Sequence, residues 1–289
     1  MSDRTSDEVI ALAQQEVAAR QAQRAAADVA RDRSWRAAFI GLGAVLLLAL
    51  LLWPSMPLNW KMYAVVHGVC AQIHNVELGG VQLPLCARNT GIYSSFLLTT
   101  LVLLVIGRAR AVRLPPLPIT ITLLLFVGVM AVDGFNSLFR DLFLPHLYTP
   151  RNDLRTLTGI GMGITMAVFM LLVINMSLRD DPDEQQPIIA GWHELAGVLG
   201  LNALVLVAMY GNLGFMYWPI AIIAWSGIVG ILFAVNVLVI ALMLGYERRI
   251  AHLTQLARPA MIALVTTSVM LGGMAWMRFW LEANGLMVN

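Results

Sequence analysis

Two short stretches of the chain place an arginine, a hydroxyl or amide side chain and a glycine directly before a long apolar run. The first is Arg88-Asn89-Thr90-Gly91, and the second is Arg155-Thr156-Leu157-Thr158-Gly159. Asn and Thr favour helix starts, and Gly lets another backbone or a ligand approach closely. Because a helix N-terminus carries partial positive charge and free amide groups, two such termini that each carry an arginine predict an anion site.

A third polar motif, VDGFNS at 132–137, follows another apolar run. Polar residues at membrane depth are rare and usually functional. Asp133 can also neutralise one of the arginines, so the motifs form either an anion site or a network that locks three helices together. The candidate ligand-binding residues are Arg88, Asn89, Thr90, Gly91, Asp133, Asn136, Arg155, Thr158 and Gly159.

The chain has two cysteines, Cys70 and Cys86, in the region between the first two apolar runs. His67, Cys70 and His74 are spaced i, i+3, i+7 and share one face if this stretch is helical. With Cys86 they form a set that is competent for zinc or copper. The alternatives are a Cys70–Cys86 disulfide, which an oxidising compartment favours, and free or redox-active thiols.

The composition assigns most of the chain to a lipid bilayer. Of 289 residues, 59% are hydrophobic and 12% charged, whereas soluble domains carry about 25% charged residues. The apolar runs must be helical, because backbone amides in hydrocarbon have no water to bind. The sequence therefore predicts an all-α, polytopic bundle. The expected spans are 37–53, 91–107, 118–132 (the shortest), 157–178, 188–210, 217–245 and 260–281.

Arginine and lysine are distributed unevenly between the two ends of the predicted spans. Thirteen fall on the side of the N-terminus and five on the other, which by the positive-inside bias predicts a cytoplasmic N-terminus and an external C-terminus in the cell membrane. The net charge of +2 does not indicate a nucleic-acid partner. We expect a cytoplasmic amphipathic helix at 1–36, a four-span core at 37–178 and three further spans at 179–289.

The motifs resemble those of the uncharacterised bacterial and archaeal membrane proteins grouped as domain-of-unknown-function family 2085. The resemblance covers about residues 60–178 and rests on the CAR-x-TG core, the Asp-Gly pair and the R-x-x-TG repeat. The histidine that often follows the first cysteine in that family is Ala71 here. The resemblance names no activity, but it implies one functional unit made of Cys70, Cys86, Arg88, Thr90, Gly91, Asp133, Arg155 and Gly159.

Three functions fit these observations. The first is an outward-facing pocket that binds or transports an anionic small molecule or a lipid head group. The second is a metal- or thiol-redox membrane protein that uses Cys70 and Cys86. The third is a structural subunit that docks with other membrane subunits. Walker, GxSxG, HExxH and dinucleotide motifs do not occur in the sequence, so common enzyme chemistry is not indicated.

Overall fold

The computed structural model describes residues 32–69 and 75–286. The expected helix at 1–36 therefore falls almost wholly outside the described residues, as do Cys70 and His74. Within the described part, the N-terminal helix Asp32–Leu52 is followed by the helices α2 to α8. Their bounds are α2 Leu58–Val66, α3 Ala87–Val105, α4 Leu117–Asp141, α5 Asn152–Leu178, α6 Trp192–Tyr210, α7 Tyr217–Met243 and α8 Ala257–Ala283.

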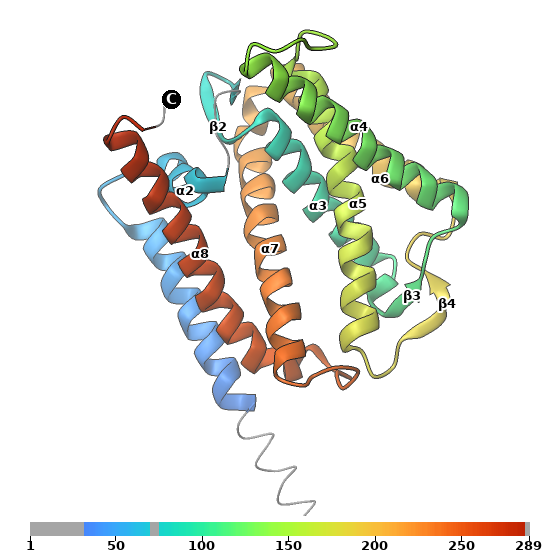
Figure 1. Cartoon of the computed structure of the whole chain (residues 1–289). Coiled ribbons are helices and arrows are strands. Elements are labelled where there is room, and N and C mark those ends of the chain that lie inside the picture. The colour runs from blue at the N-terminus through green and yellow to red at the C-terminus, as the bar shows by residue number, and fades with distance from the viewer. Residues whose placement is uncertain (1–31, 70–74, 287–289) are drawn as a thin grey trace, which may run out of the picture.

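The prediction of an all-α bundle with about seven spans is confirmed. Each predicted span corresponds to a long helix, and six helical segments of the described chain are long and apolar enough to cross a membrane. The seventh helix is α3, whose first turns carry the polar residues of the Arg88 motif. Its polar face is covered by protein, since α3 packs against α5, α6 and α7 (Figure 1).

Several helix bounds differ from the prediction. α3 and α5 begin at Ala87 and Asn152, four and five residues earlier than expected. The prediction that the third span is the shortest is wrong, because α4 has 25 residues and continues through the VDGFNS motif to Asp141. Polar residues end a span when they face lipid, but Asp133 and Asn136 are buried against neighbouring helices. The helix therefore continues.

Glycines set the close approach of the central helices. A Cβ on Gly159 of α5 would lie 2.4 Å from the Arg88 carbonyl oxygen of α3. A Cβ on Gly91 of α3 would lie 2.4 Å from the Thr156 carbonyl oxygen, and one on Gly227 of α7 would lie 1.9 Å from that of Tyr93. Small residues at such crossings let transmembrane backbones touch. α3 is thus fixed between α5 and α7.

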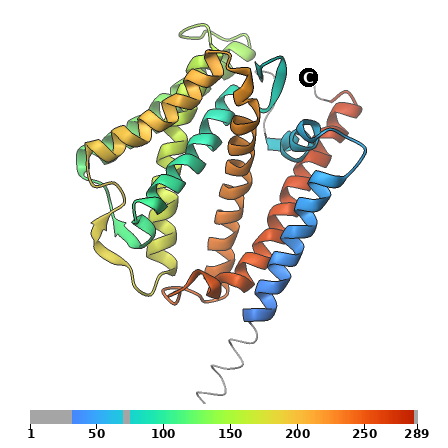
Figure 2. The ribbon, with the colours of Figure 1, turned by 180° about the vertical axis from the view of Figure 1, so that it is seen from behind.

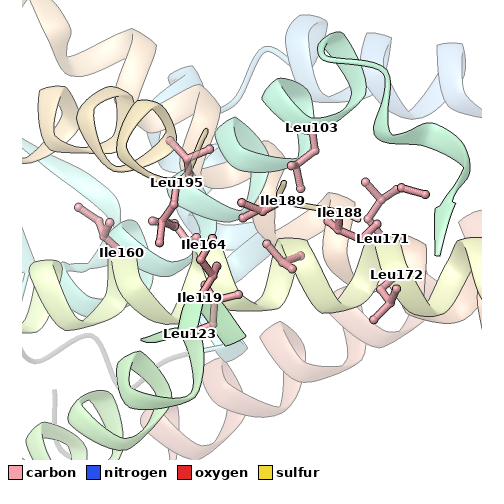
Figure 3. Close-up of a cluster of buried hydrophobic side chains, with 13 residues drawn as sticks. Leu103, Ile119, Leu123, Ile160, Ile164, Leu171, Leu172, Ile188, Ile189 and Leu195 are labelled. Atoms are coloured by element: carbon pink, nitrogen blue, oxygen red, sulfur yellow. The ribbon is translucent and has the colours of Figure 1, made fainter. Parts of the chain in front are cut away.

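One cluster of buried apolar side chains lies between α3, α4, α5 and α6. Leu103, Leu123, Ile164 and Leu195 contribute one side chain from each of these helices, and all are nearly inaccessible to solvent. Figure 3 shows these side chains converging along one length of α5. Because lipid is as apolar as leucine, the stabilisation here comes from close packing rather than from escape from water.

Two small sheets interrupt the helical pattern. β1 (Asn75–Leu78) and β2 (Val81–Cys86) form an antiparallel hairpin whose turn residues Gly79 and Gly80 have positive φ, which a tight hairpin turn requires. β2 continues directly into α3, so the residues just before the Arg88 motif form a strand. At the opposite end, β3 (Ala111–Arg113) pairs in parallel with β4 (Asp183–Pro187).

The two ends of the bundle are distinguished by these sheets. The hairpin end carries α2, the β1–β2 hairpin and the loop 142–151, and the linker end carries β3, β4 and the start of the N-terminal helix (Figure 1). Figures 1 and 2 show the N-terminal helix running beside α8 from the linker end to the hairpin end. Phe39 of that helix stacks with Phe233 of α7, with ring centroids 5.9 Å apart.

Candidate functional site

An ion pair at the hairpin end joins α3 to α4. The Arg88 Nη2 donates to Asp133 Oδ2 at 2.6 Å, and the same nitrogen lies within hydrogen-bond distance of Ser137 Oγ, at 3.1 Å. The second carboxylate oxygen, Asp133 Oδ1, accepts a 2.6 Å hydrogen bond from the Tyr148 hydroxyl. Asp133 is 1% exposed. A buried carboxylate needs this degree of pairing, since an isolated buried charge is very costly.

Arg155 of α5 lies on the other side of Ser137. Its Nε donates to Ser137 Oγ at 3.4 Å and its Nη1 donates to Asn152 Oδ1 at 3.0 Å. The residue is only 4% exposed. Its Nη2, however, is buried with no hydrogen-bond partner among the residues that the structure describes. An unmet buried donor costs about 1–3 kcal/mol, and more when the group is charged.

The cluster carries more positive than negative charge. It contains two guanidinium groups, Arg88 and Arg155, and one buried carboxylate, Asp133. The Arg88 Nε, like Arg155 Nη2, is buried and lacks a hydrogen-bond partner in the described part of the chain. Two unmet guanidinium donors beside an excess positive charge are the chemistry that an anion satisfies.

The loop 142–151 is held over this cluster by Asn136 of α4. Asn136 Oδ1 accepts from the backbone amides of Leu147 and Tyr148, at 2.7 and 3.2 Å, and its Nδ2 donates to the Tyr148 carbonyl oxygen at 2.9 Å. This seats the Tyr148 hydroxyl on Asp133. Burial, together with the hydrogen bond to Asp133, raises the pKa of Tyr148 to about 12. The hydroxyl is therefore neutral and a donor at physiological pH.

The remaining predicted ligand residues lie on the first turns of α3 and α5. Thr158 Oγ is 3.4 Å from Asp133 Oδ2, at the edge of the cluster. Thr90 is buried and its hydroxyl donates to the Leu85 carbonyl oxygen at 3.2 Å. Gly91 and Gly159 lie in the α3–α5 crossing, and Asn89 is half-buried on the first turn of α3. Their role toward a ligand stays a prediction.

The cysteine and histidine candidates do not lie in this cluster. Cys86 is half-buried and forms the N-cap position of α3. His67 is buried in a short 3-10 turn, where its Nε2 lies 2.8 Å from Glu282 Oε2 of α8 and its ring stacks on Phe279. Among the described residues, no group of three or more His, Cys, Asp or Glu can hold a metal ion. Because Cys70 and His74 fall outside those residues, the zinc or copper site and the disulfide stay predictions.

Several residues of the site were not predicted from the sequence. Ser137 could have been found from the sequence, because it lies four residues after Asp133 and therefore on the same face of a helix. Thr156 Oγ bridges two helices, 3.1 Å from the Ala87 carbonyl oxygen and 2.8 Å from the Tyr210 hydroxyl. Tyr148 and Tyr210 reach the site through loop and helix packing, for which the sequence offers no local signal.

Comparison with known families agrees with this picture. A family model described as "Predicted membrane protein (DUF2085)" matches residues 70–169. The matched segment runs from the cysteine region through α3 and α4 into α5, and so includes Arg88, Asp133 and Arg155. No curated protein and no solved structure matches the chain. The protein is thus a membrane protein whose matched segment contains the charged cluster.

Proposed function

We propose that this membrane protein binds an anionic group in the cluster formed by Arg88, Asp133 and Arg155, at the outward-facing end of the bundle. The observation that carries the proposal is the buried Arg155 guanidinium, whose Nη2 has no acceptor among the described residues. A phosphate or carboxylate oxygen supplies the missing acceptor and offsets the excess positive charge.

The two arginines of the cluster differ in how far they are exposed. The Arg88 side chain is 21% exposed, whereas that of Asp133 is 1% exposed, so Arg88 forms the accessible edge and Arg155 the buried wall. The loop 142–151 covers the opposite side and is attached to α4 through Asn136. An anionic small molecule and a lipid head group share the anionic oxygen atoms that two guanidinium groups recognise.

The test uses the full chain, delipidated in mild detergent. Inorganic phosphate, phosphatidylglycerol and phosphatidylcholine are the probes, and binding is measured by native mass spectrometry and by the shift in thermal midpoint. We expect Arg155→Lys to weaken binding of phosphate or phosphatidylglycerol about tenfold, because an ammonium keeps the charge but loses the planar donor pair. Binding of phosphatidylglycerol but not phosphate identifies a head group, and the reverse identifies a small anion.

Arg151→Lys is the matched control. Arg151 lies four residues before Arg155 at the same end of the bundle, but its side chain is 68% exposed and paired with Asp153. The control is expected to bind as the unmodified chain does. Equal binding by Arg155→Lys and Arg151→Lys, with both variants folded by size-exclusion chromatography, rejects the proposal.

The proposed orientation places the hairpin end outside the cell. Among the described residues, the linker end carries nine arginines, at positions 33, 36, 108, 110, 113, 179, 248, 249 and 258. Six lysines and arginines lie at the hairpin end, at positions 61, 88, 140, 151, 155 and 278. The positive-inside bias supports a cytoplasmic linker end. Alkaline phosphatase fused after Asn289 is expected to be active, and an inactive fusion that is present in the membrane reverses the orientation.

A further inference from the structure

A cavity of about 380 Å³ lies in the middle of the bundle's length, away from the charged cluster. It is lined by the N-terminal helix, α7 and α8, with one residue from α2. Figures 1 and 2 show the N-terminal helix and α8 side by side next to α7. The residues that line the cavity come from the facing sides of these helices. Its walls include Gly43, Leu47, Trp225, Phe233, Leu264 and Gly272.

The polar atoms of this cavity already have partners. Of its two hydroxyl side chains, Thr267 Oγ accepts from Asn236 Nδ2 at 3.0 Å, and Ser268 Oγ donates to the Leu264 carbonyl oxygen at 2.8 Å. No charged residue lines the cavity. Buried water needs about two to four polar partners. The cavity therefore favours an apolar occupant over water.

At the hairpin end the cavity is covered by α2, and on its side it is open toward the bilayer. Trp225 donates its indole N–H to the Met62 carbonyl oxygen at 3.1 Å, which fixes α2 across α7. Lys61 Nζ reaches the Leu51 carbonyl oxygen at 3.3 Å and joins α2 to the end of the N-terminal helix. On the side wall, Leu47 is 54% exposed and Leu46 is 38% exposed. In the membrane these exposed leucines contact the hydrocarbon of the bilayer, so the cavity is accessible from the hydrocarbon.

We propose that the cavity binds an acyl chain of a membrane lipid. A void between helices removes the van der Waals contacts of its walls, and an acyl chain restores them. Its volume lies within the roughly 300–1,000 Å³ of ordinary ligand pockets. By contacting the walls on both sides, the bound acyl chain stabilises the packing of the N-terminal helix and α8 against α7. This site is separate from the anion cluster and does not depend on it.

Two glycines allow the proposal to be tested without disturbing the backbone. A Cβ on Gly272 would meet no atom within 4 Å, and one on Gly43 would meet only Leu264 Cδ2 at 4.0 Å. Leucine at either position fills the cavity in place of the lipid. Gly273 and Gly41 are also free of neighbours within 4 Å, yet neither lines the cavity. They provide matched controls for each substitution.

The experiment reconstitutes the full chain in vesicles of phosphatidylcholine that carries a diazirine in the middle of one acyl chain. After illumination, labelled peptides are quantified by mass spectrometry. We expect strong labelling of the α7 and α8 segments that contain Trp225 and Leu264. Gly272→Leu should reduce it at least fivefold, and Gly273→Leu should leave it unchanged. Because the probe lipid is zwitterionic, the result does not depend on the anion cluster.

Three outcomes overturn the proposal. The first is labelling spread evenly over all lipid-facing helices. The second is equal labelling in Gly272→Leu and Gly273→Leu. The third is the absence of labelling from the α7 and α8 segments that contain Trp225 and Leu264. If Gly272→Leu does not fold, the comparison of Gly43→Leu with Gly41→Leu decides by the same criteria.

Discussion

Arg88 and Asp133 are 45 residues apart in the chain, and their side chains meet at 2.6 Å between α3 and α4. The pair does more than join two helices. Through its second oxygen Asp133 receives Tyr148 from the loop 142–151, and through Ser137 Arg88 is linked to Arg155 of α5. One buried carboxylate thus organises the groups that we propose to bind an anion.

The Asp133→Asn substitution removes the only carboxylate of the buried cluster among the described residues. Two guanidinium groups then lie together without compensation, and breaking a buried pair in this way costs about 3–5 kcal/mol. We expect the lower end of that range, since the Arg88 side chain is 21% exposed. The free energy of unfolding in mixed detergent micelles measures the change.

A double-mutant cycle separates the pair from the rest of the cluster. The variant Arg88→Gln/Asp133→Asn removes both charges and should be more stable than the sum of the single variants predicts, by about 0.5–3 kcal/mol. Additive effects would mean that the 2.6 Å contact contributes nothing to stability.

The crossing of α3 and α5 depends on a glycine. In Gly159→Ala the new Cβ would lie 2.4 Å from the Arg88 carbonyl oxygen. This oxygen belongs to the backbone of α3, which cannot move aside as a flexible side chain can. We expect a loss of about 1–3 kcal/mol or more, typical of overpacking, together with weaker binding of phosphate or phosphatidylglycerol. Gly128→Ala on α4, with nothing within 4 Å, is the control and should be neutral. Equal unfolding free energies for the two variants would contradict this packing.

The apolar pattern of the sequence is sufficient to predict the bundle, because lipid requires long helices wherever the backbone crosses it. The same rule explains the errors at Asp133 and Asn136. The prediction ends the third span at these polar residues, but their side chains face protein and α4 continues to Asp141. Arg88, Asp133 and Arg155 were expected to converge on one end of three helices, and they do.

The details of the cluster required tertiary information. The contact of Tyr148 with Asp133 is set by a loop whose course depends on Asn136. The partner of His67 is Glu282, 215 residues later in the chain. The spacing in the sequence predicts a helix face shared by His67, Cys70 and His74. In the described residues α2 ends at Val66 and His67 faces α8, and the metal site itself stays a prediction. Neither contact has a local signature, because both depend on how helices pack.

Tyr148→Phe tests the loop and gives a dependence on pH. The hydroxyl donates to a charged oxygen of Asp133, so its loss should cost about 1.5–3 kcal/mol at neutral pH. The pKa of Tyr148 is raised in the folded state from 10.0 to about 12. Its contribution is therefore complete below pH 10 and is lost as the pH rises through 12. The gap in unfolding free energy between the unmodified chain and Tyr148→Phe should narrow from pH 8 to pH 11.5.

The control for this series is Tyr246→Phe, which removes a tyrosine hydroxyl at the linker end. Measured over the same range of pH, this variant shows how much the loss of a tyrosine hydroxyl that does not contact Asp133 changes the unfolding free energy. A Tyr148→Phe gap that also stays constant would show that the hydroxyl does not stabilise the fold through Asp133.

The contact of His67 with Glu282 ties the turn after α2 to α8. His67 is 1% exposed, its Nε2 lies 2.8 Å from the carboxylate, and Arg278 Nε reaches the other oxygen of Glu282 at 2.5 Å. Glu282→Gln removes the charge that both groups share while keeping the side-chain shape, so we expect a loss of about 1.5–3 kcal/mol in unfolding free energy. Asp153→Asn breaks an exposed ion pair at the same end and should cost at most about 1 kcal/mol. If the two substitutions cost the same, the buried contact adds no more than a surface pair, and the attachment of this turn to α8 must come from its apolar packing on Phe279.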